Sequence, residues 1–193
     1  LLQAGLDGWV RATTTIAKAW EPYPRARRAL ACLRAAARLT ALEHHGRDRL
    51  EGVHSATRQK LLDLAAASLV DLDLLAERHL DGNHLLVDRL ALAAGEAVWG
   101  GGRKALRAAA DETDRQFLAD GSHVEASPMY HALLVEDLLV LQAVSSPAGG
   151  DAHRRILAAA ERAGGWLAAV RHPEGHLPAF GDIGADLGAS QVA

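Results

Sequence analysis

The chain has 193 residues, 49% of them hydrophobic, which is enough apolar material for one domain with a core and argues against disorder. Its formal net charge is −3, its acids and bases are interspersed, and only 4% of residues are aromatic, which excludes a basic or base-stacking nucleic-acid surface. No apolar run approaches the ~20 residues needed to span a bilayer, so no membrane partner is expected.

The predicted elements begin after an N-terminal segment, residues 1–24. Trp20 to Pro24 contains two prolines and predicts an irregular connector. Apolar positions then recur at helical spacing, and Ser55 can cap a long helix whose leucines nearly encircle it. A helix that is apolar on most sides is expected to be packed on most sides. The single cysteine, Cys32, is expected to be a small buried hydrophobe rather than a nucleophile.

Glycine and proline divide the rest of the chain. Ser127 followed by Pro128 predicts an N-cap and a first helical position, and Gly82 or Asn83 can cap an earlier helix. The expected helices span residues 25–42, 56–80, 84–99, 103–119, 128–144 and 151–170. The alternation typical of strands is missing. We therefore expect a single all-α domain over 1–193, with its helices in 25–171 and a coil tail in 172–193.

Two polar turns interrupt this Ala- and Leu-rich pattern. The first reads D-G-N-H over residues 81–84, and the second reads D-G-S-H-V-E-A-S-P-M-Y-H over residues 120–131. The second turn holds two histidines, a glutamate and one of only two tyrosines in the chain. The chemistry of the protein is expected at these turns.

Four blocks of sequence resemble the N-terminal domain of the heparinase II/III-like polysaccharide lyases. Two strong blocks surround the turns, and two weaker ones lie near the ends of the chain. The matching residues are Trp20, Pro22, Tyr23 and Pro24 with Arg27 and Arg28; Glu77, His79, Leu80, Gly82, Asn83, His84, Leu85 and Leu86; Gln116, Asp120, Gly121, Glu125, Ser127, Pro128, Met129, Tyr130 and His131; and Leu177, Pro178, Phe180 and Asp182. Their order and approximate spacing agree with that family over residues 20–182.

The resemblance implies an incomplete α/α toroid of stacked antiparallel helical hairpins, with a groove at one end. In that family a C-terminal β-sandwich domain follows, closes the groove and supplies part of the site. The sequence starts at Leu1 without a signal-like segment and reaches Ala193 without a sandwich. We therefore expect a piece of a longer protein, which as this fragment lacks part of the site that activity needs. The resemblance also favours a periplasmic or extracellular location.

The family's activity is β-elimination on uronic-acid polysaccharides, so the implied partner is an acidic polysaccharide or oligosaccharide. By this resemblance Asn83 donates its amide to the uronate carboxylate, with His84 beside it. Tyr130 protonates the leaving oxygen and, on some epimers, also acts as the base. A phenol near pKa ~10 needs neighbouring positive charge to act as a base. His84 or His131 can provide that charge or can be the base itself.

The other site candidates have structural alternatives. Glu125 is expected to hold a neighbouring group or to bind substrate, and Gln116 either lines the groove or is an exposed helix residue. Trp20 and Tyr23 form a sugar-stacking wall or anchor the connector. Tyr130 and His131 can also simply pack, and Asn83 can be a helix cap. Three further apolar side chains are expected in the core: Trp99, Trp166 and Met129.

Ten histidines raise the question of a metal. His79 and His84 lie across a helix break, His44 and His45 are adjacent, and His172 and His176 lie in coil. None forms a helical H-x-x-x-H pair, so no metal and no other cofactor is expected. Two further functions stay open. One is a carbohydrate-binding or scaffold toroid without catalysis. The other is an α/α-toroid glycoside hydrolase using a carboxylate pair, for which Asp81 and Glu125 are the candidates.

Overall fold

A computed structural model of the protein describes residues 15–44, 51–80, 82–145 and 150–182, with Gly5, Asp7, Gly8 and Arg11; for His44 and for residues 51–54 it gives only the backbone. Its elements are a 3₁₀ helix, η1 (Ala17–Trp20), and the helices α2 (Pro22–His44), α3 (Glu51–Leu69), α4 (Leu72–Leu75), α5 (Asn83–Trp99), α6 (Lys104–Gln116), α7 (Pro128–Val144) and α8 (Gly150–Val170). These ranges contain no β-strand, so the predicted all-α class is confirmed. No helix within them is long and apolar enough to cross a bilayer.

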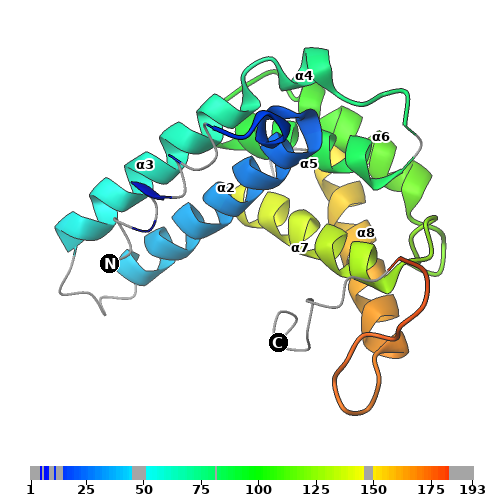
Figure 1. The fold of residues 1–193 in the computed structure, drawn as a ribbon. Coiled ribbons are helices and arrows are strands. Elements are labelled where there is room, and N and C mark those ends of the chain that lie inside the picture. Colours follow the sequence, from blue (N-terminus) through cyan, green and yellow to red (C-terminus); the bar gives the residue numbers. More distant parts are fainter. Residues whose placement is uncertain are drawn as a thin grey trace.

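The long helices pack as consecutive pairs. Helix α2 lies against α3, α5 against α6, and α7 against α8 (Figure 1). The first helices of these pairs, α2, α5 and α7, also contact one another, and α6 contacts α8. Helix α5 therefore lies in contact with both α2 and α7, which places the N-terminal ends of α5 and α7 in one packed unit.

The core between these helices consists mainly of leucine and alanine. Leu86 and Leu90 of α5 and Leu138 of α7 are fully buried, and each such side chain stabilises the fold by about 1.5–3 kcal/mol. Cys32 of α2 is buried as predicted. Burial raises the pKa of its thiol to about 11, so it stays protonated and serves as a packing residue.

Helix α2 begins earlier than the sequence indicated. It starts at Pro22, so Pro22 to Pro24 form its first turn and the expected connector there is wrong. The first N–H groups of a helix have no acceptor within the helix, so a proline there loses no hydrogen bond. The two prolines therefore mark a helix start rather than a break, and they place Tyr23 on a rigid element.

The expected helix over 56–80 is also wrong. Helix α3 already begins at Glu51, ends at Leu69 and is followed by the short α4, because Asp71 has a left-handed backbone with φ 57°. The Arg25 side chain from α2 donates to the carbonyl oxygens of Ser68, at 3.0 Å, and Val70, satisfying the end of α3. Leu74, expected to pack, is 79% exposed.

Three other expectations differ in detail. Helix α6 ends at Gln116 rather than near residue 119. Trp99 is not a core residue but is 47% exposed, because it is the last residue of α5 and the glycines after it have no side chains to cover it. Trp166 and Met129 are half-buried.

The end of the chain follows α8 without further helix over the described residues 171–182, in agreement with the expected coil. The rest of that predicted tail, residues 183–193, lies outside the described part of the chain, as do His45, Asp81 and most of residues 1–14.

Candidate functional site

The two polar turns seen in the sequence lead into two helices that are in contact. Gly82 precedes α5, so Asn83 is its first residue. Ser127 caps α7 as predicted, because its hydroxyl oxygen accepts a hydrogen bond from the Tyr130 backbone N–H at 3.2 Å. Both candidate side chains therefore lie in the first turn of a helix.

A small hollow, too narrow in this structure to hold a water molecule, brings these side chains together. Its walls are Tyr23 of α2, Asn83 and Val87 of α5, and Tyr130, Leu133 and Leu134 of α7. Asn83 is 7% exposed, whereas Tyr130 and Tyr23 are half-buried. An amide and two phenols are thus grouped over an otherwise apolar surface.

Glu125 holds Asn83 in place across the two turns. One carboxylate oxygen accepts from the Asn83 backbone N–H at 2.5 Å, and the other accepts from Asn83 Nδ2 at 2.7 Å. A Cβ on Gly82 would overlap this carboxylate, so glycine there leaves room for Glu125 in the position seen. Of the two alternatives expected for Glu125, the structure shows the one in which it holds a neighbouring group.

The Glu125 contact also decides which way the Asn83 amide faces. A carboxylate only accepts hydrogen bonds, so the Nδ2 group must lie toward Glu125. Asn83 Oδ1 is then left buried without a hydrogen-bond donor among the described residues. A buried acceptor without a partner is costly, and it is the kind of atom that a ligand hydroxyl satisfies.

A network of buried hydrogen bonds around Gln116 supports these contacts. The Gln116 amide donates to the Gly82 carbonyl oxygen at 2.9 Å and to Glu112 at 2.6 Å, and its own oxygen contacts His123 Nε2 at 2.9 Å. Gln116 is only 5% exposed. The sequence suggested that Gln116 either lines a groove or lies exposed on a helix, and the structure shows neither. Gln116 is buried and holds the backbone of Gly82 at the start of α5.

His123, which had no role in the sequence prediction, links this network to the Glu125 loop. Its Nδ1 accepts from the Glu125 backbone N–H at 3.3 Å. Burial lowers the pKa of His123 to about 4, so the ring is neutral near pH ~7. Its position within the second turn was the only signal available in the sequence.

His131 lies inside the fold rather than at the hollow. It is 1% exposed, its Nε2 contacts the Ala163 carbonyl oxygen at 2.9 Å, and its ring packs against Phe117 and Trp166. Burial lowers its pKa. His131 is therefore a packing residue, and its ring does not line the hollow.

His84 lies on the outer side of the same turn. Its ring stacks on Tyr23 with centroids 4.1 Å apart and an interplanar angle of 17°, and its Nδ1 contacts Glu77 Oε2 at 2.9 Å. The His84 side chain is 43% exposed. The Glu77 carboxylate thus fixes one ring nitrogen of a partly exposed imidazole.

Tyr130 has an acidic neighbour rather than a basic one. Its hydroxyl lies 3.3 Å from Asp182 Oδ2, and Ser127 Oγ donates to the Asp182 carbonyl oxygen at 2.5 Å. Burial and then the Asp182 charge raise the pKa of Tyr130. The positive charge expected from His84 or His131 does not lower it, so this phenol remains a proton donor.

Trp20 lies apart from the hollow. It belongs to η1, where the Arg28 guanidinium lies over its ring at 4.7 Å and donates to the Ala19 carbonyl oxygen at 3.0 Å. Arg28 also donates to Ser68 Oγ of α3 at 2.9 Å. Of the two roles expected for Trp20, these contacts support the one in which it anchors its segment to the helices rather than stacking on a sugar.

Asp88, one turn after His84 on α5, makes the stability of this region pH-dependent. It is completely buried, and Oδ2 accepts from the Glu77 N–H at 3.3 Å while no described residue reaches Oδ1. Burial raises its pKa from 3.8 to about 6. The native state thus binds a proton more tightly than the unfolded chain. The stability that this gives is present at low pH and is lost as the pH rises toward 6.

Replacing Asp88 with Asn should remove that loss. Each pKa unit is worth ~1.36 kcal/mol, so the variant should gain up to about 3 kcal/mol over the wild type between about pH 4 and pH 8. Urea unfolding of both proteins across this range measures the gain. The lowered pKa of His123 makes stability rise with pH, which is the opposite of the Asp88 effect. Both proteins contain His123, so the difference in stability between them reports Asp88 alone. A difference that stays constant with pH would contradict the assignment.

A larger groove of about 590 Å³ lies between α2, α7 and α8 and is lined by Arg34, Arg38, Val135 and Leu139 among others. Neither Asn83 nor Tyr130 belongs to its walls. Of the carboxylate pair considered for a hydrolase, Glu125 is occupied on both oxygens by Asn83, and Asp81 lies outside the described residues.

Comparison of the chain with protein-family models, with curated proteins and with solved structures finds no match in any of the three.

Proposed function

We propose that the chain is the helical part of a uronic-acid polysaccharide lyase of the heparinase II/III-like kind, and that the hollow bounded by Asn83, Tyr130 and Tyr23 is its site. The observation that carries this proposal is the placement of Asn83 and Tyr130 on one surface by two separate helix starts. The same geometry supports the three roles that an elimination needs.

The first role is to stabilise charge at the uronate carboxylate. The proton at C5 is a poor acid while the neighbouring carboxylate is charged, so hydrogen bonds must strengthen as negative charge develops. Asn83 is rigid because Glu125 fixes both its backbone and its amide. We propose that its second Nδ2 hydrogen donates to the carboxylate, and that the buried Oδ1 accepts from a sugar hydroxyl or from a protonated carboxyl once the hollow opens to substrate.

The second role belongs to Tyr130. As the base takes the C5 proton, the electron pair forms the C4–C5 double bond and the C4–O bond breaks. Tyr130 then gives its hydroxyl proton to the departing glycosidic oxygen. A phenol whose pKa is raised by burial and by Asp182 is well suited to hold this proton until the bond breaks.

The third role, the base, falls to His84. Glu77 contacts its Nδ1, which favours the tautomer that has its proton there and leaves Nε2 as the proton acceptor. The same carboxylate stabilises the imidazolium that forms when the C5 proton is taken. Tyr23, stacked on the ring, restricts its rotation.

The fold is proposed to be part of an α/α toroid. Three consecutive helix pairs, with α2, α5 and α7 in mutual contact, support this arrangement. In the resembled family the site is completed by a β-sandwich domain. We therefore propose such a domain as the structural partner and an acidic polysaccharide as the substrate.

Incubation with a panel of uronate polymers tests the function. The chain, expressed with any sequence that flanks it in its gene, should generate unsaturated sugar ends that absorb in the ultraviolet. Binding of acidic oligosaccharides without such ends would favour a non-catalytic carbohydrate-binding toroid. Reducing ends formed without ultraviolet absorption would favour a hydrolase.

A further inference from the structure

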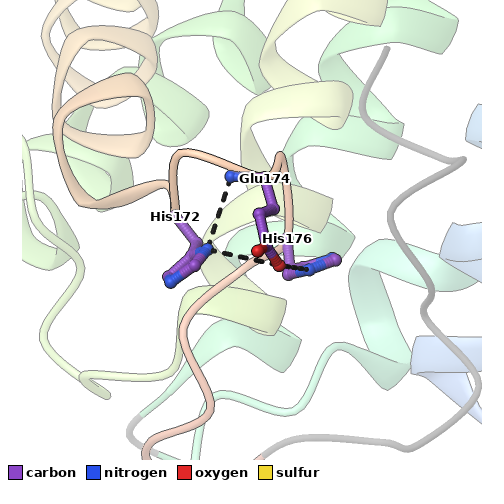
Figure 2. Close-up of side chains that lie close together, drawn as sticks. All are labelled: His172, Glu174 and His176. Carbon is purple, nitrogen blue, oxygen red and sulfur yellow. Dashed lines mark hydrogen bonds and ion pairs between the residues drawn. The ribbon is translucent and has the colours of Figure 1, made fainter.

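The turn that follows α8 brings together three side chains that bind metals. It reads R-H-P-E-G-H over residues 171–176, and Figure 2 shows the Glu174 carboxylate between the rings of His172 and His176. All three are exposed. Their sequence spacing predicted no site because the segment is not helical, but a tight turn can also place i and i+4 side chains together.

The backbone holds this turn closed. The His172 N–H donates to the His176 carbonyl oxygen at 3.0 Å, and the Gly175 N–H donates to the His172 carbonyl oxygen at 2.7 Å. Gly175 has φ 92°, which suits glycine, and Pro173 has a fixed φ. The Arg171 side chain also donates to the Gly175 carbonyl oxygen at 2.9 Å. The three side chains are thus brought together by a backbone closed by its own hydrogen bonds.

The distances between the donor atoms suit one small cation. Glu174 Oε2 lies 3.0 Å from His176 Nε2 and 3.9 Å from His172 Nδ1, and the three donor atoms lie within 4.8 Å of one another. Ligands about 2.1 Å from a tetrahedral Zn²⁺ are roughly 3.4 Å apart, so small side-chain rotations suffice. The His172 and His176 rings are nearly parallel, with centroids 5.7 Å apart.

The lone pair on His172 Nδ1 already faces into the turn. The Glu174 backbone N–H approaches this atom at 3.4 Å, so the nitrogen acts as an acceptor there. This contact is long and weak, and a metal ion can replace it at little cost. The Glu174 carboxylate offsets the repulsion between the ion and the Arg171 guanidinium.

We propose that His172, Glu174 and His176 form a Zn²⁺ site, with water as the fourth ligand. Two imidazoles and one carboxylate are a donor set that Zn²⁺ prefers, whereas Mg²⁺ and Ca²⁺ prefer oxygen ligands. The turn lies on the segment that continues to Asp182, whose carboxylate contacts Tyr130. A bound ion therefore fixes one end of the segment that covers the start of α7.

Titration with metal ions tests the site independently of the lyase proposal. The chain is titrated with Co²⁺, followed by visible absorption, and with Zn²⁺, followed by calorimetry and by the histidine ring signals in NMR. One ion should bind and shift the His172 and His176 signals. His172→Ala and His176→Ala should each weaken binding at least about tenfold.

Two controls complete the test. His79→Ala removes another exposed histidine and should leave this binding unchanged. Glu174→Gln should weaken binding without altering the helical circular dichroism, since the turn lies at the surface. The proposal is overturned if the wild type binds no Zn²⁺ at micromolar concentrations. It is equally overturned if the variant lacking both His172 and His176 binds with the wild-type affinity and stoichiometry.

Discussion

Replacing Tyr130 with Phe should lower kcat for elimination by roughly 10²–10⁴-fold, the usual loss when a positioned general acid is removed. The hydroxyl makes its described contact with Asp182 at 3.3 Å, while the ring packs beside Leu134. Phenylalanine keeps the ring, so the fold should be retained. Initial rates of formation of unsaturated ends, with circular dichroism as the check on folding, measure the effect.

Tyr23, the other tyrosine of the chain, provides the matched control. It lines the same hollow, but its ring stacks on His84 and its pKa is raised mainly by burial. Tyr23→Phe keeps the stacked ring and should reduce kcat by less than about tenfold. Equal losses for the two variants, or no loss for Tyr130→Phe, would show that the Tyr130 hydroxyl does not protonate the leaving oxygen.

The second large effect is expected for Glu125→Ala. This carboxylate joins the two turns, and its removal leaves the Asn83 backbone N–H and side-chain amide buried without acceptors. Each buried group left without a partner costs about 1–3 kcal/mol. The free energy of unfolding should therefore fall by roughly 2–4 kcal/mol, as measured by urea denaturation.

Glu125→Gln and Glu161→Ala separate this contact from general effects of losing an acid. Glutamine keeps one acceptor oxygen, so its variant should lie between the wild type and Glu125→Ala. Glu161 is an exposed residue of α8, and its replacement should change stability by at most about 0.5 kcal/mol. If Glu125→Ala were no less stable than Glu161→Ala, the proposed connection between the turns would be wrong.

Local rules predicted the start of α7, which depends on neighbouring residues in sequence, but they missed the starts of α2 and α3. Ser127 and Pro128 fix the start of α7, and the predicted range of that helix matches the observed one. The end of α3 could not be found in this way. It depends on Arg25, which reaches the Ser68 and Val70 carbonyl oxygens from a separate helix, and on the left-handed backbone of Asp71.

The site residues also fall into those that local sequence could identify and those whose place depends on contacts between distant segments. The polar turns identified Asn83 and Tyr130 as candidates, and the structure places both beside one hollow. The positions of the other candidates, Gln116 and His131, depend on burial. Gln116 is drawn inside because the Gly82 carbonyl oxygen needs a donor, and His131 is covered by Phe117 and Trp166. Such contacts join distant segments and leave no periodic signal in the sequence.

The measurement that tests the account most directly is NMR mapping of a saturated uronate oligosaccharide on the chain, using backbone amide, side-chain amide and aromatic signals. We predict that the Asn83 amide and the Tyr130 ring shift together, with the same concentration dependence, while signals along the α2–α7 groove stay in place. Shifts confined to that groove, around Arg34 and Arg38, with Asn83 and Tyr130 unchanged, would contradict it.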